Sequence, residues 1–170
     1  MTQFSDETDK ETVFEAVAAM LSEKNLTFIN KDDKRPWGGF FVLDESQSED
    51  FIKAFFSHLS LEDFSQAHKL SPKILIVAPE KRLSWQYHFR RAEIWKVLSG
   101  TVGIKTSFTD EEQDLQTLQP GDIVELAQGQ RHRLIGLESW GILAEIWQHT
   151  DPEDPSDEND IVRVQDDFGR

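Results

Sequence analysis

The 170-residue sequence contains no cysteine, which excludes a disulfide framework, a thiolate nucleophile and a cysteine-based zinc site. It also has no apolar run that approaches the roughly 18 to 20 residues of a membrane-spanning helix. The beginning of the chain, MTQFSDETDKETVFEAVAAM, is acidic and amphipathic, whereas a secretory signal starts with basic residues followed by a continuous apolar run. We therefore expect no membrane span and predict the cytoplasm as the compartment.

Basic residues are scarce, with 18 Lys and Arg against 32 Asp and Glu and a formal net charge of −14. Nucleic acids and anionic membranes bind clusters of Lys and Arg, so neither is an expected partner. Residues 64–100 reverse this balance, with seven basic residues and two acidic ones. This stretch favours an anionic small molecule as partner, although lysines along solvated strand edges would give the same pattern.

The first part of the chain has the hydrophobic period of helices. Apolar residues recur at i, i+3 or i+4 spacing and predict a helix over Lys10–Glu23. Residues 47–68 show the same period twice, which predicts two short helices before Pro72. The surplus of apolar residues on these helices predicts a homodimer, and the alternative is that they pack on the chain's own barrel.

From Lys73 onward the pattern changes to that of strands. Short runs rich in β-branched and aromatic residues are separated by turn signals such as Ser99-Gly100 and Gln128-Gly129. The runs are KILIVA, RLSWQYHF, AEIWKVL, TVGIKTSF, DIVEL, HRLIGL and GILAEIW. Many short strands joined in this way predict an all-β barrel or sandwich.

The length and the absence of an internal repeat or linker predict one domain over residues 1–170. Within it we expect a helical N-terminal region with an insertion (1–72), a barrel core (73–150) and a tail (151–170).

Four residues have the spacing of a metal site. Gln86 and His88 are two apart and leave the same face of a strand, Glu93 follows near the start of the next strand, and His132 begins a later one. Together they offer an amide oxygen, two imidazoles and a carboxylate, a mixed set suited to a divalent ion. A single His on a strand is more often a hydrogen-bonded neutral residue, so the prediction depends on the combined spacing.

The same spacing resembles the two motifs of the cupins, small jelly-roll β-barrels. The matching residues are Gln86-x-His88-x4-Glu93-x6-Gly100 and Gly121-x7-Gly129-x2-His132. Two positions depart from the motifs, because Glu80 stands where a Gly is usual and Ala127 where a Pro is usual. The resemblance implies an all-β cupin barrel with an N-terminal helical extension and a helical insertion.

Flanking residues are similar to a narrower family, the type II mannose-6-phosphate isomerases. The similar pieces are Arg35-Pro36-Trp37-Gly38, Leu83 to His88, Arg91 to Trp95, His132-Arg133-Leu134, Asp160 to Arg163 and Asp167 to Arg170. In that family the cupin often follows a guanylyltransferase domain, but these residues contain no Gly-rich nucleotide loop, so the resemblance implies only the isomerase chemistry. Three further departures are the insertion near residues 44–72, Trp147, which stands where the family has Gln, and a following loop that is a few residues longer.

The resemblance implies a metal-dependent aldose–ketose isomerase acting on a phosphosugar, with mannose 6-phosphate and fructose 6-phosphate as the first pair. It implies one divalent ion on Gln86, His88, Glu93 and His132, with zinc as first choice and manganese, iron, cobalt or nickel as alternatives. Two rival functions stay open: a non-catalytic cupin that binds metal and sugar, and a cupin enzyme of another reaction type.

Residues outside the metal site also have candidate roles. Glu145 is our candidate base, because it falls on a late strand of the barrel. The resemblance implies guanidinium groups suited to phosphate or oxyanions from Arg133, Arg35, Arg163 and Arg170. The alternative for the terminal arginines is a structural salt bridge to Asp160, Asp166 or Asp167.

Overall fold

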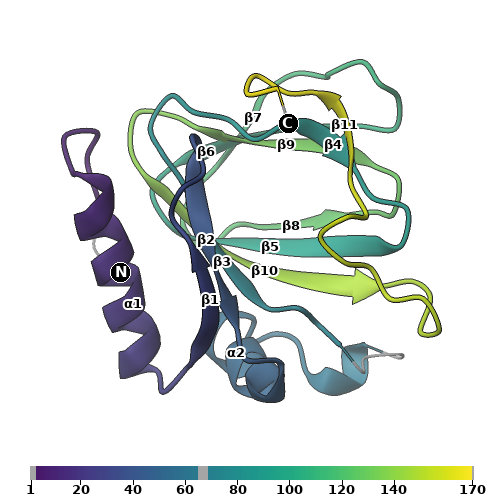
Figure 1. The fold of residues 1–170 in the computed structure, drawn as a ribbon, viewed down its shortest axis with the longest axis horizontal. Coiled ribbons are helices and arrows are strands. Elements are labelled where there is room, and N and C mark those ends of the chain that lie inside the picture. The colour runs from purple at the N-terminus through teal and green to yellow at the C-terminus, as the bar shows by residue number, and fades with distance from the viewer. Residues whose placement is uncertain (1–2, 65–68, 170) are drawn as a thin grey trace.

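Two antiparallel β-sheets face each other and enclose a core, as the computed structural model of residues 3–64 and 69–169 shows (Figure 1). One sheet has six strands in the order β1-β2-β3-β10-β5-β8, and the other has five in the order β11-β4-β9-β6-β7. The strands are β1 (Phe28–Asp32), β2 (Gly38–Leu43), β3 (Lys73–Val77), β4 (Trp85–Tyr87), β5 (Arg91–Ser99), β6 (Val102–Ser107), β7 (Gln116–Leu118), β8 (Ile123–Leu126), β9 (Arg131–Gly136), β10 (Gly141–His149) and β11 (Val162–Gln165). The prediction of an all-β fold with small helical parts is confirmed.

The helices cover the outer face of the six-stranded sheet. Helix α1 spans Lys10–Glu23, as predicted, and begins where Asp9 accepts a hydrogen bond from the Thr12 backbone N–H. In the insertion, η1 (Glu45–Gln47) leads into α2 (Ser48–Phe55). The second short helix predicted there is only the 3-10 turn η2 (Leu61–Asp63), and the rest of that prediction falls on 65–68, outside the described residues.

Two apolar clusters hold these layers together. The inner cluster lies between the sheets and includes Leu75, Val97 and Leu143. The outer cluster lies between the six-stranded sheet and the helices. Because side chains on a strand alternate between its two faces, each central strand of this sheet contributes to both clusters.

Strands β1 and β2 come from the region before Lys73, which was expected to be helical. They extend the six-stranded sheet, since β2 pairs antiparallel with β3 along Gly38–Val42. Strand β1 has four exposed residues out of five and shows no apolar alternation, so its sequence carries little strand signal. The barrel therefore includes part of the N-terminal region.

The apolar face of α1 is buried within the chain. Val13, Phe14, Val17 and Leu21 are all at most 4% exposed and belong to the outer cluster. This intramolecular packing is the alternative considered above, and it removes the observation on which the homodimer was expected. The homodimer stays a prediction. Among the described residues, none of the helices has the length and hydropathy that crossing a membrane requires.

Candidate metal centre and pocket

The inner faces of three neighbouring strands change from apolar to polar toward the same end of the barrel. On β5 the inward side chains run from Val97 through Trp95 to Glu93, and on β10 from Leu143 to Glu145. The register places Glu145 opposite Trp95, and on its other side opposite Lys73 of β3. One end of the barrel is therefore packed with apolar side chains, while the other end collects ionisable groups.

Three of the predicted ligands converge at this polar end. His88, Glu93 and His132 are each 2% exposed, and one potential ligand atom from each lies within 4.8 Å of the others. They come from both sheets, because Glu93 lies on β5 while His88 follows β4 and His132 lies on β9. Gln86 pairs with His132 across β4 and β9, and its Oε1 accepts a hydrogen bond from the Ser84 hydroxyl at 2.6 Å.

Hydrogen bonds to backbone carbonyls fix how both imidazoles face the cluster. His88 Nδ1 lies 2.6 Å from the Asp160 carbonyl oxygen, and His132 Nδ1 lies 3.0 Å from that of Gln130. A carbonyl only accepts, so Nδ1 carries the proton in both rings and Nε2 keeps its lone pair. This is the tautomer that a metal-ligating His commonly adopts.

The buried Nε2 of His132 has no hydrogen-bond partner in the structure. Buried polar atoms are normally paired, and an exception calls for a specific explanation. Beside His88 and a carboxylate, this nitrogen fits a divalent ion, since two imidazoles and a carboxylate form a common ligand set. The residues present therefore suit the metal that the cupin motifs imply.

Glu93 is ionised in its surroundings. Burial opposes ionisation, but the two neighbouring imidazoles and the Arg91 guanidinium outweigh it and hold the pKa of Glu93 below its ordinary value. Arg91 Nε donates to Glu93 Oε1 at 2.7 Å. For His88, burial together with the Arg91 charge lowers the pKa to about 4, against the opposing effect of Glu93. At neutral pH the cluster thus offers a carboxylate and neutral imidazoles, the forms that bind metal.

A second buried carboxyl group lies next to the cluster. The Trp95 indole N–H is shared between Glu93 Oε2 at 3.1 Å and Glu145 Oε1 at 2.9 Å. Burial and the negative charge of Glu93 raise the pKa of Glu145 to about 8, although Lys73 opposes this shift. Two carboxyl groups joined by one donor thus have opposite pKa shifts, a pattern typical of sites where one group is an anion and the other transfers a proton.

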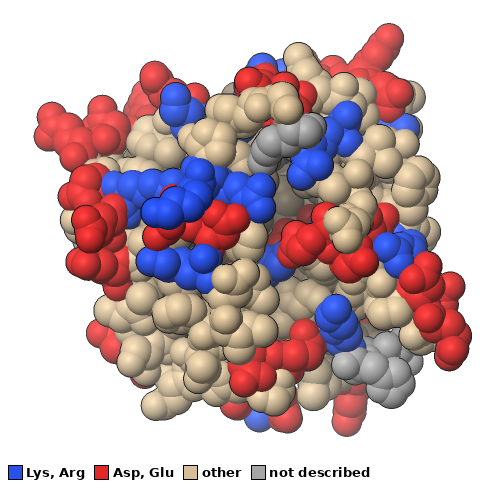
Figure 2. Space-filling model, viewed as in Figure 1, with Lys and Arg blue, Asp and Glu red and all other residues tan. Residues whose placement is uncertain are grey.

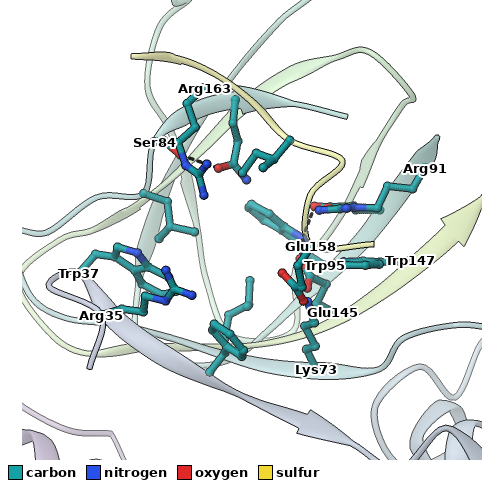
Figure 3. Close-up of a pocket in the computed structure, with 16 residues that line it drawn as sticks. Arg35, Trp37, Lys73, Ser84, Arg91, Trp95, Glu145, Trp147, Glu158 and Arg163 are labelled. Atoms are coloured by element: carbon teal, nitrogen blue, oxygen red, sulfur yellow. Dashed lines mark hydrogen bonds and ion pairs between the residues drawn. The ribbon is translucent and has the colours of Figure 1, made fainter. Parts of the chain in front are cut away.

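These groups line a single pocket (Figure 3). Its cationic residues are Arg35, Lys73, Arg91 and Arg163, and its acidic residues are Glu93, Glu145 and Glu158. In the view of Figure 3, Arg35 and Arg163 lie on one side of the pocket, and Glu145, Lys73 and Arg91 lie on the other. Figure 2 shows basic side chains around the hollow on this face, with acidic ones both beside them and at the margins. The acidic protein therefore has a local environment suited to an anionic ligand.

Comparison with known families agrees with this geometry. Residues 48–166 match the family described as "Mannose-6-phosphate isomerase C-terminal". The chain belongs to this family. A search of curated proteins found no match.

Solved structures show the same cupin fold at low sequence identity. A mutant of Bacillus subtilis oxalate decarboxylase OxdC aligns with a TM-score of 0.55 and 11% identity. The aligned region covers 79% of this chain and 30% of the OxdC chain. The capsular polysaccharide assembling protein CapF from Staphylococcus aureus aligns with a TM-score of 0.53 and 15% identity. The aligned region covers 82% of this chain and 34% of the CapF chain. This chain thus spans about a third of each relative, and the likeness concerns the fold alone.

One departure from the cupin motifs is explained by the backbone. Glu80 has a φ of 55°, in the left-handed region that glycine adopts at least cost. This cupin therefore keeps the turn conformation although the glycine is replaced.

The structure brings some of the predicted contact residues to the pocket but not others. Arg35 and Arg163 line it. Arg133 follows the inward-facing His132 and points to the opposite face of β9, where it donates to Glu112 and Gln165. Arg170 lies outside the described residues.

Arg91, Lys73 and Glu158 line the pocket but had no predicted role. Arg91 and Lys73 both lie over the Trp147 ring, at 3.5 and 3.8 Å from its centroid. Lys73 also pairs with Glu158, from the segment before β11. The alternation of β3 could have indicated that Lys73 faces inward, but only the fold places it beside Glu145.

We expect purified protein to bind about one divalent ion per chain and to lose thermal stability on chelation. A ligand that binds only the folded state stabilises it, and about 100-fold excess over its dissociation constant should raise the unfolding midpoint by roughly 5 to 10 °C. Elemental analysis and thermal unfolding with and without chelator test this. An unchanged midpoint on addition of zinc, manganese, iron, cobalt and nickel would refute the metal centre.

Proposed function

We propose that this cupin is a metal-dependent aldose–ketose isomerase acting on a phosphosugar, with mannose 6-phosphate and fructose 6-phosphate as the first pair to test. The observation that carries the proposal is the pairing of the His88, Glu93 and His132 cluster with Glu145 in one cation-lined pocket. Membership of the isomerase-domain family supports the same chemistry. Zinc is the first candidate ion, followed by manganese, iron, cobalt and nickel.

The reaction moves one proton from C2 to C1 and a second from O2 to O1, while negative charge builds up on an enediolate. A bound divalent ion supplies Lewis-acid stabilisation of that charge. Glu145 is our candidate for carrying the proton, because a carboxyl whose pKa lies near neutrality both accepts and returns a proton. The Trp95 N–H holds this carboxyl in place, and Lys73 lies opposite it across the β3–β10 pair.

The cations on the other side of the pocket are proposed to bind the phosphate. Arg35 donates its Nε to Asp32 at 2.7 Å, which orients the guanidinium at the pocket wall. Arg163 enters from β11, whose backbone pairs with β4 at Gln86. Two guanidinium groups suit a phosphate dianion, because each offers several N–H donors in a planar fork.

The direct test is a screen of phosphorylated and free aldoses for isomerisation, with and without chelator. We expect metal-dependent turnover of a phosphorylated aldose. If metal-loaded protein isomerises no aldose, the isomerase proposal fails, and saturable sugar binding without turnover would then support the non-catalytic alternative. Turnover of another kind would support a different cupin enzyme.

Replacing Arg163 with Ala should raise the KM for the phosphorylated sugar about 10- to 100-fold, since a hydrogen bond to a charged group contributes roughly 1.5 to 3 kcal/mol. The kcat and the metal content should change little, because a phosphate remote from the reacting carbons binds alike in the ground and transition states. Arg82→Ala is the matched control, because Arg82 pairs with Asp167 and does not line the pocket. An Arg163→Ala variant with wild-type KM would make Arg163 structural.

A further inference from the structure

The segment that joins β10 to β11 (Figure 1) passes close to the metal-ligand cluster, because its Asp160 contacts His88. Most of its residues from 150 to 160 are exposed, as expected for an acidic loop. Ser156 and Asp160 are exceptions, with 0% and 6% of their surface exposed. A buried carboxylate is costly unless hydrogen bonds satisfy it, so the partners of Asp160 indicate what this segment does.

The Asp160 carboxylate binds the turn between β4 and β5, which contains His88 and leads to Glu93. Its oxygens accept from the backbone N–H groups of Phe89 and Arg90, each at 2.9 Å. A third donor is the hydroxyl of Ser156, at 2.6 Å. Phe89 and Arg90 lie between His88 and Glu93 in the chain, so these bonds fix the turn that sets the relative position of the two ligands.

The Asp160 backbone carbonyl acts on His88 directly. It accepts from His88 Nδ1 at 2.6 Å, which orients the ring and leaves the Nε2 lone pair directed into the cluster. The ring Nε2 lies 3.2 Å from Glu93 Oε1. The contact of Arg91 Nη2 with this nitrogen, at 3.1 Å, agrees with the same tautomer, because a guanidinium only donates.

The same segment also holds the Arg91 side chain. Arg91 Nη1 donates to the Ser156 hydroxyl at 2.9 Å and to the Asp157 carbonyl at 3.1 Å. Arg91 Nε then reaches Glu93. Two of the three clustered ligands are thus oriented from one short segment, through three kinds of contact: a carboxylate, a carbonyl and a guanidinium.

We propose that Asp160 is a positioning residue of the metal centre, which holds His88 and the turn to Glu93 in the geometry that binds the ion. The inference rests on the metal centre proposed above but not on the isomerase reaction. Outer partners of this kind typically contribute 10- to 100-fold to metal affinity. The acidic segment before β11 is therefore part of the centre, although it supplies none of the three clustered ligands.

The test measures zinc affinity by chelator competition in metal-free Asp160→Asn and Ser156→Ala variants at a temperature where circular dichroism shows each to be folded. Asn keeps the size of the side chain but replaces one acceptor oxygen with a donor, so we expect affinity to fall about 10- to 100-fold. Asp154→Asn is the matched control, because it makes the same change in the same segment at an exposed ion pair with Arg90. Its affinity should stay within about twofold of wild type.

A second readout is the nuclear magnetic resonance signal of the His88 Nδ1 proton. In metal-free wild type it should be slow to exchange, and in Asp160→Asn it should exchange faster or disappear. A purely structural role would lower the unfolding temperature but leave both readouts unchanged, and that result would overturn the inference. If Asp160→Asn does not fold, wild-type affinity in Ser156→Ala would overturn it instead.

The positioning role of Asp160 and the proposed isomerase activity are refuted by different results. Weakened zinc binding in Asp160→Asn, together with no turnover of any aldose by wild type, would uphold the positioning role and refute the isomerase. A wild type that binds no metal would overturn the metal centre and this inference together.

Discussion

Replacing Glu93 with Gln is expected to lower metal affinity more than about 100-fold and to remove turnover with it, because outer partners alone contribute 10- to 100-fold. Glu93 supplies the only carboxylate of the three-residue cluster, and a neutral amide cannot balance the charge of a divalent ion. The fold should persist, since Arg91 keeps its bonds to Ser156 and to the Asp157 carbonyl. Metal content, affinity and turnover are measured on the same preparation.

Glu125→Gln is the control for this change, because Glu125 lies exposed on β8 and pairs with β5 one residue away from Glu93. It should bind metal and turn over substrate as wild type does. A Glu93→Gln protein that keeps wild-type metal affinity would show that the ion binds elsewhere.

Replacing Glu145 with Gln should leave the metal bound but lower kcat about 10²- to 10⁴-fold, the range that a positioned acid or base contributes. Gln can keep the hydrogen bond from Trp95, since its amide oxygen still accepts, but it cannot carry a proton. Glu138→Gln, at an exposed loop position, is the control. Unchanged kcat in the Glu145 variant would assign the proton transfer to another group.

The same variant should alter the pH dependence of stability in the metal-free protein. Burial raises the pKa of Glu145 from 4.5 to about 8. A raised pKa means that Glu145 holds its proton more tightly in the folded state than in the unfolded one, and this proton binding stabilises the fold. The stabilisation is complete below the pKa of the unfolded state, 4.5, and is lost as pH rises through about 8. Glu145→Gln should therefore be less sensitive to pH between about 5 and 8, which denaturant unfolding at a series of pH values measures.

Much of the fold could be predicted because its signals are local. The i, i+3 and i+4 spacing gave the bounds of α1, and alternation after Lys73 gave the central strands. Strand β7, with three residues, and strand β1, with four exposed residues of five, lack such a signal. They form because neighbouring strands provide partners, which a local pattern does not contain.

The convergence of His88, Glu93 and His132 was predictable for a similar reason, since the motif spacing places them at fixed points in or beside strands of the two facing sheets. The rest of the pocket depends on which strands become neighbours in space. Arg133 is instructive, because it directly follows an inward-facing His and the period of two already places it on the other face. The stacking of Arg91 and Lys73 on Trp147 needs three strands in register and could not be read from any one of them.

Because β2 pairs with β3, the folded barrel begins earlier in the chain than the stretch that matches the family. The family match begins at residue 48, after β2 has ended, yet all five residues of β3 are buried between β2 and β10. A fragment that began there would leave β3 with an unpaired edge. It would also lack Arg35, Trp37 and Phe40, which line the pocket. The matched stretch therefore contains the ligand cluster but not every residue that lines the pocket.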